Sequence, residues 1–123
     1  MSKNYSVPEI LSQAAPLVKK TETRWPELGA LLWELHQKVT PGEFQRLAKE
    51  LGMGQRMAYY LVSIHECFTR RLKRPIPEDI PWRTLCEVTD ILTWDNAERL
   101  LAFCRAHSRE QVLAALKTKT LRK

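Results

Sequence analysis

One predicted helix carries four polar side chains on its outward face: Gln55, Arg56, Tyr59 and Ser63. These side chains offer hydrogen-bond donors and acceptors, and an arginine guanidinium can donate to O6 and N7 of guanine at the same time. Such chemistry recognises the edges of bases and breaks no covalent bond. The four residues are therefore the candidate base-reading set of this chain.

Positive charge is concentrated around the same helix. The 123-residue chain has 20 Lys and Arg against 14 Asp and Glu, a formal net charge of +6. Residues 41–74 have a net charge of +4, whereas residues 75–116 have a net charge of −3. Because phosphate neutralisation and counterion release supply most non-specific affinity for nucleic acids, this asymmetry favours a polyanionic partner. The residues expected to bind phosphates are Arg46, Lys49, Arg70, Arg71, Lys73 and Arg74.

The surrounding residues predict the two helices that would position these side chains. Residues 44–63 read FQRLAKELGMGQRMAYYLVS, which has the spacing of two helices that cross at a tight turn. Crossing helices need small side chains where their axes approach, here Ala48 and Ala58, and a turn residue that tolerates a positive φ, here Gly52. The two helices are expected over about 41–51 and 55–72, with further inward side chains from Leu47, Leu51, Met53 and Leu61.

The segment EFQRLAKELGMGQRMAYYLV resembles the helix-turn-helix units of small bacterial, phage and plasmid DNA-binding proteins, among them transcriptional repressors, partition proteins and regulators of mobile elements. The resemblance covers about residues 43–63 only. It implies that the second helix lies in the major groove of duplex DNA and that a homodimer reads two half-sites. Gly54 opens the second helix where Ser or Thr is usual, so a common phosphate-contacting hydroxyl is lost.

Helical patterns dominate the whole chain, and strand patterns are almost absent. We therefore predict an all-α fold, a compact bundle of six to seven helices that contains the helix-turn-helix. Residues 1–123 would form a single domain, with an N-terminal half at 1–74 and a C-terminal helical subdomain at 82–116. The prolines within 75–81 predict a stiff joint between them, and residues 117–123 form a basic tail.

Capping boxes predict three helix starts, at Ser6, Thr40 and Ser108. Pro16 and Pro26 should break or kink the N-terminal region, which predicts two or three helices before residue 40. Beyond the joint, three short helices are expected over 82–92, 94–107 and 109–116. Their inward residues would be Trp82, Leu85, Val88, Leu92, Ala97, Leu100, Leu101, Cys104, Val112 and Leu116. The tryptophans expected to be core anchors are Trp25, Trp33, Trp82 and Trp94.

Patterns typical of catalysis or metal binding are missing. Cys67, Cys86 and Cys104 are far apart and form no C-x-x-C, which favours reduced thiols in a helical core. His65 and Cys67 would diverge by about 200° on a helix, so they do not share a metal. Only four glycines are present, and they form no phosphate loop. We expect no enzymatic activity, no metal and no cofactor.

Two functional hypotheses follow. The first is sequence-specific binding of duplex DNA by a homodimeric regulator, or a partition or maintenance factor, of a mobile element. The alternative is a non-enzymatic helical adaptor, small subunit or inhibitor that binds a protein–nucleic-acid assembly. Residues 82–116 would supply the dimer surface or a site for a protein partner. Tyr59 and Tyr60 would point about 100° apart on a helix, and either one could pack inward.

No apolar run reaches the length of about 18 residues that a membrane span needs. The N-terminal sequence MSKNYSVPEI also lacks the apolar region of a signal peptide. A cytoplasmic protein without a membrane partner is therefore expected.

Overall fold

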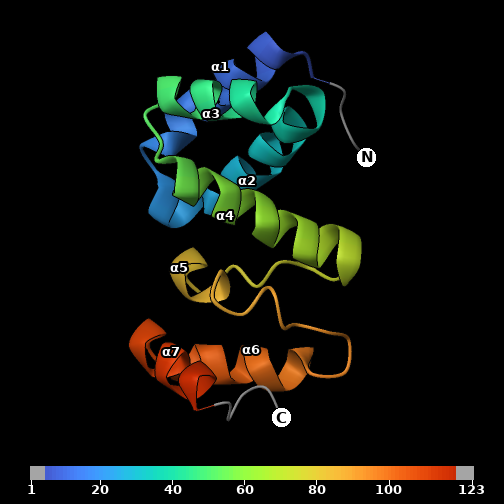
Figure 1. Ribbon diagram of the computed structural model, residues 1–123, viewed down its shortest axis with the longest axis vertical. Helices are drawn as coiled ribbons and strands as arrows, with labels where there is room; N and C mark the ends of the chain where they lie inside the picture. Colours follow the sequence, from blue (N-terminus) through green and yellow to red (C-terminus); the bar gives the residue numbers. More distant parts are fainter. Residues whose placement is uncertain (1–4, 119–123) are drawn as a thin grey trace. The chain divides into compact units, whose positions relative to one another are not determined.

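The computed structural model describes residues 5–118, and these residues are all-α, as predicted (Figure 1). They form seven α-helices and one π-helix, and none of them forms a strand. None of the helices in the described part of the chain is long and apolar enough to cross a membrane. The elements are α1 (Val7–Val18), α2 (Thr21–Lys38), α3 (Pro41–Glu50), α4 (Gln55–His65), η1 (Glu66–Arg71), α5 (Trp82–Leu85), α6 (Ala97–Ala106) and α7 (Arg109–Lys117).

The three predicted capping residues all begin helices. The side-chain oxygens of Ser6, Thr40 and Ser108 accept hydrogen bonds from the amide three residues further on, at 3.4, 3.2 and 3.2 Å. At Ser6 and Ser108 the side chain of that later residue also accepts from the amide of the cap, at 2.9 Å in each case. These bonds satisfy amides that lack a partner in the first helical turn, and they explain where α1, α3 and α7 start.

Two helices precede residue 40, as predicted, and the second is kinked near its proline. Arg24 has a φ of −113° and a ψ of 17°, outside the helical range, two residues before Pro26. A proline has no amide to donate and crowds the preceding turn, which accounts for the break. The first helix ends at Val18, shortly after Pro16.

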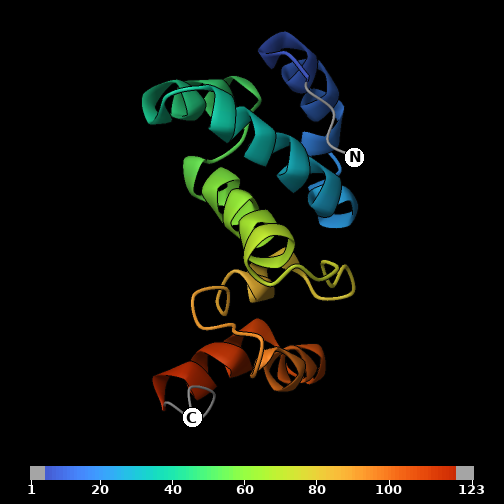
Figure 2. The same cartoon turned by 90° about the vertical axis from the view of Figure 1, so that its right-hand side faces the viewer.

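The contacts between Cα atoms divide the chain into two units, one up to His65 and one from Glu66 onward. In the first unit α2 contacts α1, α3 and α4. Figure 2 shows α1 and α2 packed against each other. The buried core of this unit comes from all four helices and the turn, through Ile10, Ala14, Trp25, Leu28, Leu32, Leu35, Phe44, Leu47, Ala48, Met53, Ala58, Leu61, Val62 and Ile64.

The helices α2 and α4 lie close together at a glycine. A Cβ atom placed on Gly29 would lie 3.1 Å from the backbone oxygen of Leu61, which is closer than ordinary van der Waals contact. A side chain at this position would have to push the two backbones apart by a few tenths of an ångström. The sequence assigned close approach to Ala48 and Ala58 alone, so this second approach is a finding of the structure.

The second unit begins with the π-helical segment η1. The amide of Leu72 donates to the carbonyl of Cys67 at 2.8 Å, a bond across five residues that marks the wider π turn. Cys67, Phe68 and Leu72 are all buried. The helix predicted over 55–72 is therefore α-helical only as far as His65.

The residues before the proline-rich joint pack within this second unit. Arg71 donates a hydrogen bond to the carbonyl of Thr89, and Arg74 forms an ion pair with Glu98 at 2.7 Å. The division between the units therefore follows His65, whereas the sequence placed the joint at 75–81. The single domain stays a prediction, and residues 119–123 of the predicted basic tail lie outside the described residues.

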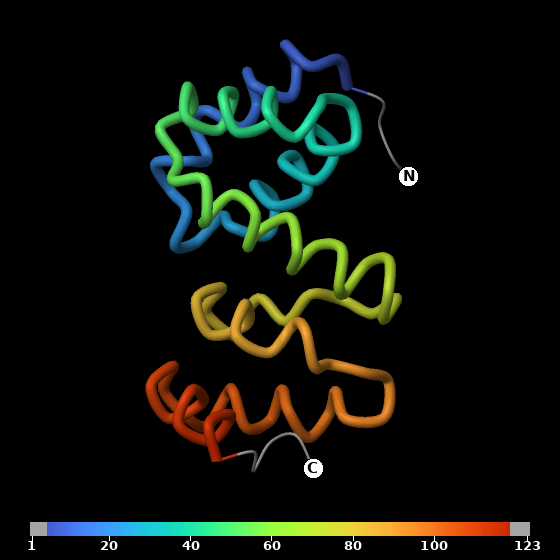
Figure 3. The backbone as a smooth tube through the Cα atoms, viewed as in Figure 1, coloured from blue at the N-terminus to red at the C-terminus, as the bar shows by residue number. Residues whose placement is uncertain are grey.

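The helix predicted over 82–92 is wrong beyond its first turn. α5 ends at Leu85, and the chain continues through turns in which Val88 donates to the carbonyl of Leu85 at 3.0 Å (Figure 3). The side chain of Arg71 donates a hydrogen bond to the carbonyl of Thr89 within these turns. Threonine disfavours the helix interior, so Thr84 and Thr89 lower the local preference for a helix here.

Trp94 is not a core anchor, because its side chain is 64% exposed. It lies in a turn held by Asn96, whose side chain accepts from the amide of Thr93 at 2.7 Å and donates to the carbonyl of Ile91 at 2.8 Å. These bonds delay the start of α6 to Ala97, so the helix predicted from residue 94 begins later. The other predicted inward residues in this unit are buried, except Leu116, which is half-buried. Among the remaining predicted tryptophan anchors, Trp25 and Trp82 are buried and Trp33 is half-buried.

Candidate nucleic-acid interface

The turn between α3 and α4 has the backbone geometry that its glycine predicts. Gly52 has a φ of +85°, which confirms the expected positive φ. Its amide donates to the carbonyl of Lys49 at 2.9 Å, and the amide of Met53 donates to the carbonyl of Ala48 at 3.0 Å. The turn thus satisfies the last carbonyls of α3, and the chain reverses before α4 begins at Gln55 (Figure 1).

Small buried residues lie behind this turn. Ala48 of α3 and Ala58 of α4 are both fully buried, and α3 contacts α4 directly. This burial confirms the inward positions that the sequence assigned to them. The larger inward residues are buried at Leu47, Met53 and Leu61 and half-buried at Leu51.

The two faces of α4 differ in character. Its apolar side chains Ala58, Leu61 and Val62 are buried. At about 100° per residue, the polar and aromatic side chains on the other side fall within an arc of about 140°. That outward face consists of Gln55, Arg56, Tyr59, Tyr60 and Ser63, of which Tyr59 is half-buried and the others are exposed.

Three of the four predicted base-reading residues meet in one hollow. Gln55, Arg56, Tyr59 and the neighbouring Tyr60 line an open depression of about 710 Å³. Ser63 is exposed further along the same helix, outside this lining. The depression is therefore a surface with hydrogen-bonding groups and aromatic rings on one helix face.

The two tyrosines have different surroundings. The ring of Tyr59 lies 5.0 Å from that of Phe44 and 5.7 Å from that of His36, measured between centroids. His36 in turn meets Phe44 edge-on at 5.1 Å. Tyr60, by contrast, is 37% exposed. Tyr59 is therefore the tyrosine that packs inward, and its ring is held by side chains from α2 and α3.

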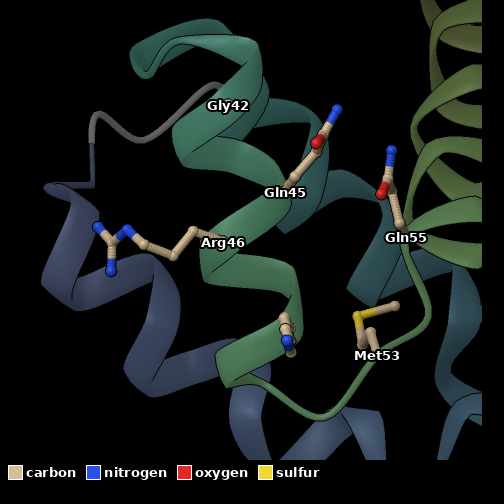
Figure 4. Close-up of a pocket in the computed structure, with 6 residues that line it drawn as sticks. Gly42, Gln45, Arg46, Met53 and Gln55 are labelled. Atoms are coloured by element: carbon tan, nitrogen blue, oxygen red, sulfur yellow. The ribbon is translucent and has the colours of Figure 1, made fainter.

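A second hollow of about 400 Å³ adjoins the first, because Gln55 lines both. In Figure 4 the side chains of Gln45 and Gln55 extend toward the same side, whereas Arg46 extends from another flank of α3. The lining also includes two cationic side chains, so it could hold an anionic group. Its residues are Gly42, Gln45, Arg46, Lys49, Met53 and Gln55.

The two predicted phosphate-binding residues of α3 are both exposed. Arg46 forms an ion pair with Glu50 one helical turn away, and both side chains are more than half exposed. An exposed pair of this kind contributes little to stability, so a phosphate could compete for the guanidinium. Lys49 also lines the second hollow. The structure thus brings Arg46 and Lys49 together with Gln55.

Arg71 has partners within the second unit. Its guanidinium donates to the carbonyl of Thr89 and lies 3.1 Å from the sulfur of Cys67. Burial raises the pKa of the Cys67 thiol, although the positive charge of Arg71 acts in the opposite direction. Arg71 therefore stabilises the turn at Thr89, a role that the sequence did not predict.

The remaining predicted phosphate contacts also belong to the second unit. The side chain of Arg74 is 24% exposed and pairs with Glu98. Arg70 and Lys73 are exposed, and Lys73 has a positive φ of 51°. The phosphate role of these residues stays a prediction, while Arg74 has a structural partner already.

The three cysteines are free thiols. Burial raises the pKa of Cys86 and of Cys104 to about 11, so both thiols are protonated at neutral pH. Within residues 5–118 no group of three or more His, Cys, Asp or Glu side chains is placed to hold a metal ion.

Two residues of the hollows were outside the predicted set. Gln45 lies one helical turn before Lys49, and Tyr60 lies one turn after Arg56, so helical spacing alone could have added both. No family model, curated protein or solved structure matches this chain.

Proposed function

We propose that this chain is a sequence-specific duplex DNA-binding protein in which α3, the turn and α4 act as a helix-turn-helix. The observation that carries the proposal is the division of α4 into a buried apolar face and an open polar face. The major groove of B-DNA admits an α-helix, and each base pair presents a distinct set of donors and acceptors there. A supported helix with a free polar face has the form that such readout needs.

The side chains on α4 have chemistry suited to base edges. Arg56 in the first turn can donate to O6 and N7 of guanine, and the amide of Gln55 can pair with N6 and N7 of adenine. The hydroxyl of Ser63 can donate or accept further along the groove. Tyr59 offers the edge of a ring that is held in place by its contacts with Phe44.

Phosphates would be bound mainly from α3. Lys49 and Arg46 line the hollow that begins beside Gln55, so their charges flank the proposed recognition helix. The other four candidate residues belong to the second unit, where Arg71 and Arg74 would have to share their guanidinium groups with existing partners. Lys49 is therefore the better residue with which to test a phosphate contact.

A homodimer is part of the proposal, because one recognition helix touches too few base pairs for a specific site. Residues 82–116 would supply the dimer surface. A role as regulator or as partition or maintenance factor of a mobile element rests on the resemblance of residues 43–63 to such proteins.

Selection of bound sequences from a random duplex pool tests the proposal. The expected result is one enriched motif with two inverted half-sites spaced by about 10 base pairs or a multiple of that spacing. A pool that remains random after repeated selection would refute sequence-specific readout.

Two alanine variants separate base contacts from phosphate contacts. Arg56→Ala should cost about 1–3 kcal/mol on the selected site and relax the preference at one base pair. Lys49→Ala should weaken all duplexes about equally and reduce the salt slope by about one. Lys19→Ala removes an exposed charge at the end of α1 and serves as the control, for which we expect little change. Uniform weakening by both Arg56→Ala and Lys49→Ala would contradict base reading by Arg56.

A protein-binding adaptor is the second candidate, and the exposure of Trp94 favours it. A largely exposed tryptophan in a segment with a net charge of −3 suits a basic protein partner. Gel shifts with duplex DNA, single-stranded DNA and RNA at two salt concentrations distinguish the candidates. Equal and strongly salt-dependent binding of all three would favour the adaptor, and duplex preference would favour DNA readout.

A further inference from the structure

The hollow on α4 combines one cation with two aromatic rings. Arg56 and Tyr60 lie one helical turn apart on the outward face, and Tyr59 forms the wall beside them. Tyr59 is fixed by Phe44 and His36, whereas Tyr60 is partly exposed at the surface. A group that enters this hollow next to Arg56 therefore lies beside two tyrosine side chains.

The major groove offers very few apolar groups to such rings. Guanine, adenine and unmodified cytosine present only hydrogen-bonding groups and ring carbons there, whereas thymine adds a methyl group at C5. Cytosine gains the same group when it is methylated at C5. Tyr60 lies one helical turn after Arg56 in the same hollow, so a guanidinium bound to guanine would place Tyr60 near the neighbouring bases of the groove.

We propose that this hollow reads the 5-methyl group of a pyrimidine next to the guanine bound by Arg56, with the ring of Tyr60 as the contacting surface. The inference rests on the proposed function and names the feature of duplex DNA that α4 distinguishes. Hydrogen bonds from Arg56 identify the guanine, and contact with Tyr60 adds affinity for the methylated neighbour.

The test uses the full chain and the duplex recovered by selection. Thymines in that duplex are replaced by uracil one position at a time, which removes a methyl group and keeps every base pair. At one position per half-site we expect affinity to fall by about fourfold for each lost methyl group. A second arm replaces cytosine by 5-methylcytosine next to guanine. A fourfold gain in affinity with 5-methylcytosine, without a loss when uracil replaces thymine, assigns the methyl group to methylcytosine. A loss with uracil, without a gain from 5-methylcytosine, assigns it to thymine.

Variants of Tyr60 connect the methyl effect to this side chain. Tyr60→Phe keeps the ring, so it should retain the fourfold discrimination between thymine and uracil. Tyr60→Ser removes the ring, so both duplexes should bind equally. Because Tyr60 is partly exposed, both variants should fold, and thermal melting followed by circular dichroism verifies this.

Two negative results have different meanings. If the chain binds no duplex in preference to random DNA, the proposed function fails and the inference fails with it. If it binds its selected duplex but tolerates every loss or gain of a 5-methyl group, or if Tyr60→Ser discriminates as well as the unaltered chain, only the inference is overturned.

Discussion

Replacement of Gly52 measures how far the turn between α3 and α4 depends on one backbone angle. At a φ of +85° a residue with a Cβ atom is strained, by about 1–2 kcal/mol for most side chains. No atom lies within 4 Å of the added Cβ, so no steric contact contributes to the cost. Alanine also restricts the unfolded chain, which offsets about 0.4–1 kcal/mol of that strain. Gly52→Ala should therefore destabilise the fold by about 1 kcal/mol, and the β-branched Gly52→Val by about 2 kcal/mol.

Gly54 provides a matched control two residues further on. An added Cβ there also meets nothing within 4 Å, but the φ of Gly54 is not positive. The strain is therefore absent, and the restriction of the unfolded chain acts alone. Restriction of the unfolded chain by Gly54→Ala should raise the free energy of unfolding by a few tenths of a kcal/mol. Alanine is a poorer cap than glycine at the start of α4, which offsets part of this gain, so the net change should lie between zero and a few tenths of a kcal/mol.

Urea denaturation followed by circular dichroism gives the free energies for Gly52→Ala and Gly54→Ala, and thermal melting is the second measurement. A difference of about 1 kcal/mol corresponds to roughly 4 °C in melting temperature for a chain of this size. Equal stability of the two variants would show that the turn does not hold Gly52 at a positive φ. It would also remove the geometric support for the proposed helix-turn-helix.

Three further perturbations test other parts of the fold. The free energy of unfolding in urea should be lower for Gly29→Ala than for Gly42→Ala by about 1 kcal/mol or more, because an added Cβ meets the α4 backbone at Gly29 and meets nothing at Gly42. Equal stability of the two variants would mean that α2 and α4 are further apart. Arg71→Ala should lose about 1–2 kcal/mol of stability through its bond to Thr89, whereas the exposed Lys117→Ala should lose almost none; identical melting curves would exclude a structural role for Arg71. Burial raises the pKa of Cys104 from 9.0 to about 11, so the folded state favours the protonated thiol. The stability that this preference contributes is present below pH 9 and is lost as the pH rises through 11. Raising the pH from 8 to 11 should therefore destabilise the unaltered chain more than Cys104→Ala, as measured by urea denaturation at each pH, and an equal loss would refute the shift.

The features that could be predicted from the sequence have causes within a few residues. The caps at Ser6, Thr40 and Ser108 bind amides only three positions away, so the pattern contains both partners. The positive φ at Gly52 is likewise a local property of a short turn. The helical spacing of the apolar residues was enough to predict that Ala48 faces inward, and Ala48 is fully buried. For these elements, residue type and spacing were sufficient.

The features that could not be predicted depend on side-chain hydrogen bonds that the apolar pattern does not record. The guanidinium of Arg71 binds the carbonyl of Thr89, eighteen residues away, in the turns that follow α5. Trp94 is exposed because the side chain of Asn96 holds a turn where the apolar pattern suggested a helix. Periodicity records which side chains are apolar, and it contains no information about which distant side chain will bind a given carbonyl.

The orientation of the proposed recognition face depends on such a distant contact. The side of α4 that packs at Gly29 is the one that carries Leu61, and Arg56 lies about 140° from Leu61 around the helix. The missing side chain at Gly29 lets the backbones of α2 and α4 come close there, so α2 contributes to which side of α4 is buried and therefore to which side is open. The turn at Gly52 sets where α4 begins, but the contact with α2 sets how it is rotated. For the proposed DNA readout, Gly29→Ala should therefore change the motif that is recovered from a random duplex pool, although no residue of α2 belongs to the candidate base-reading set.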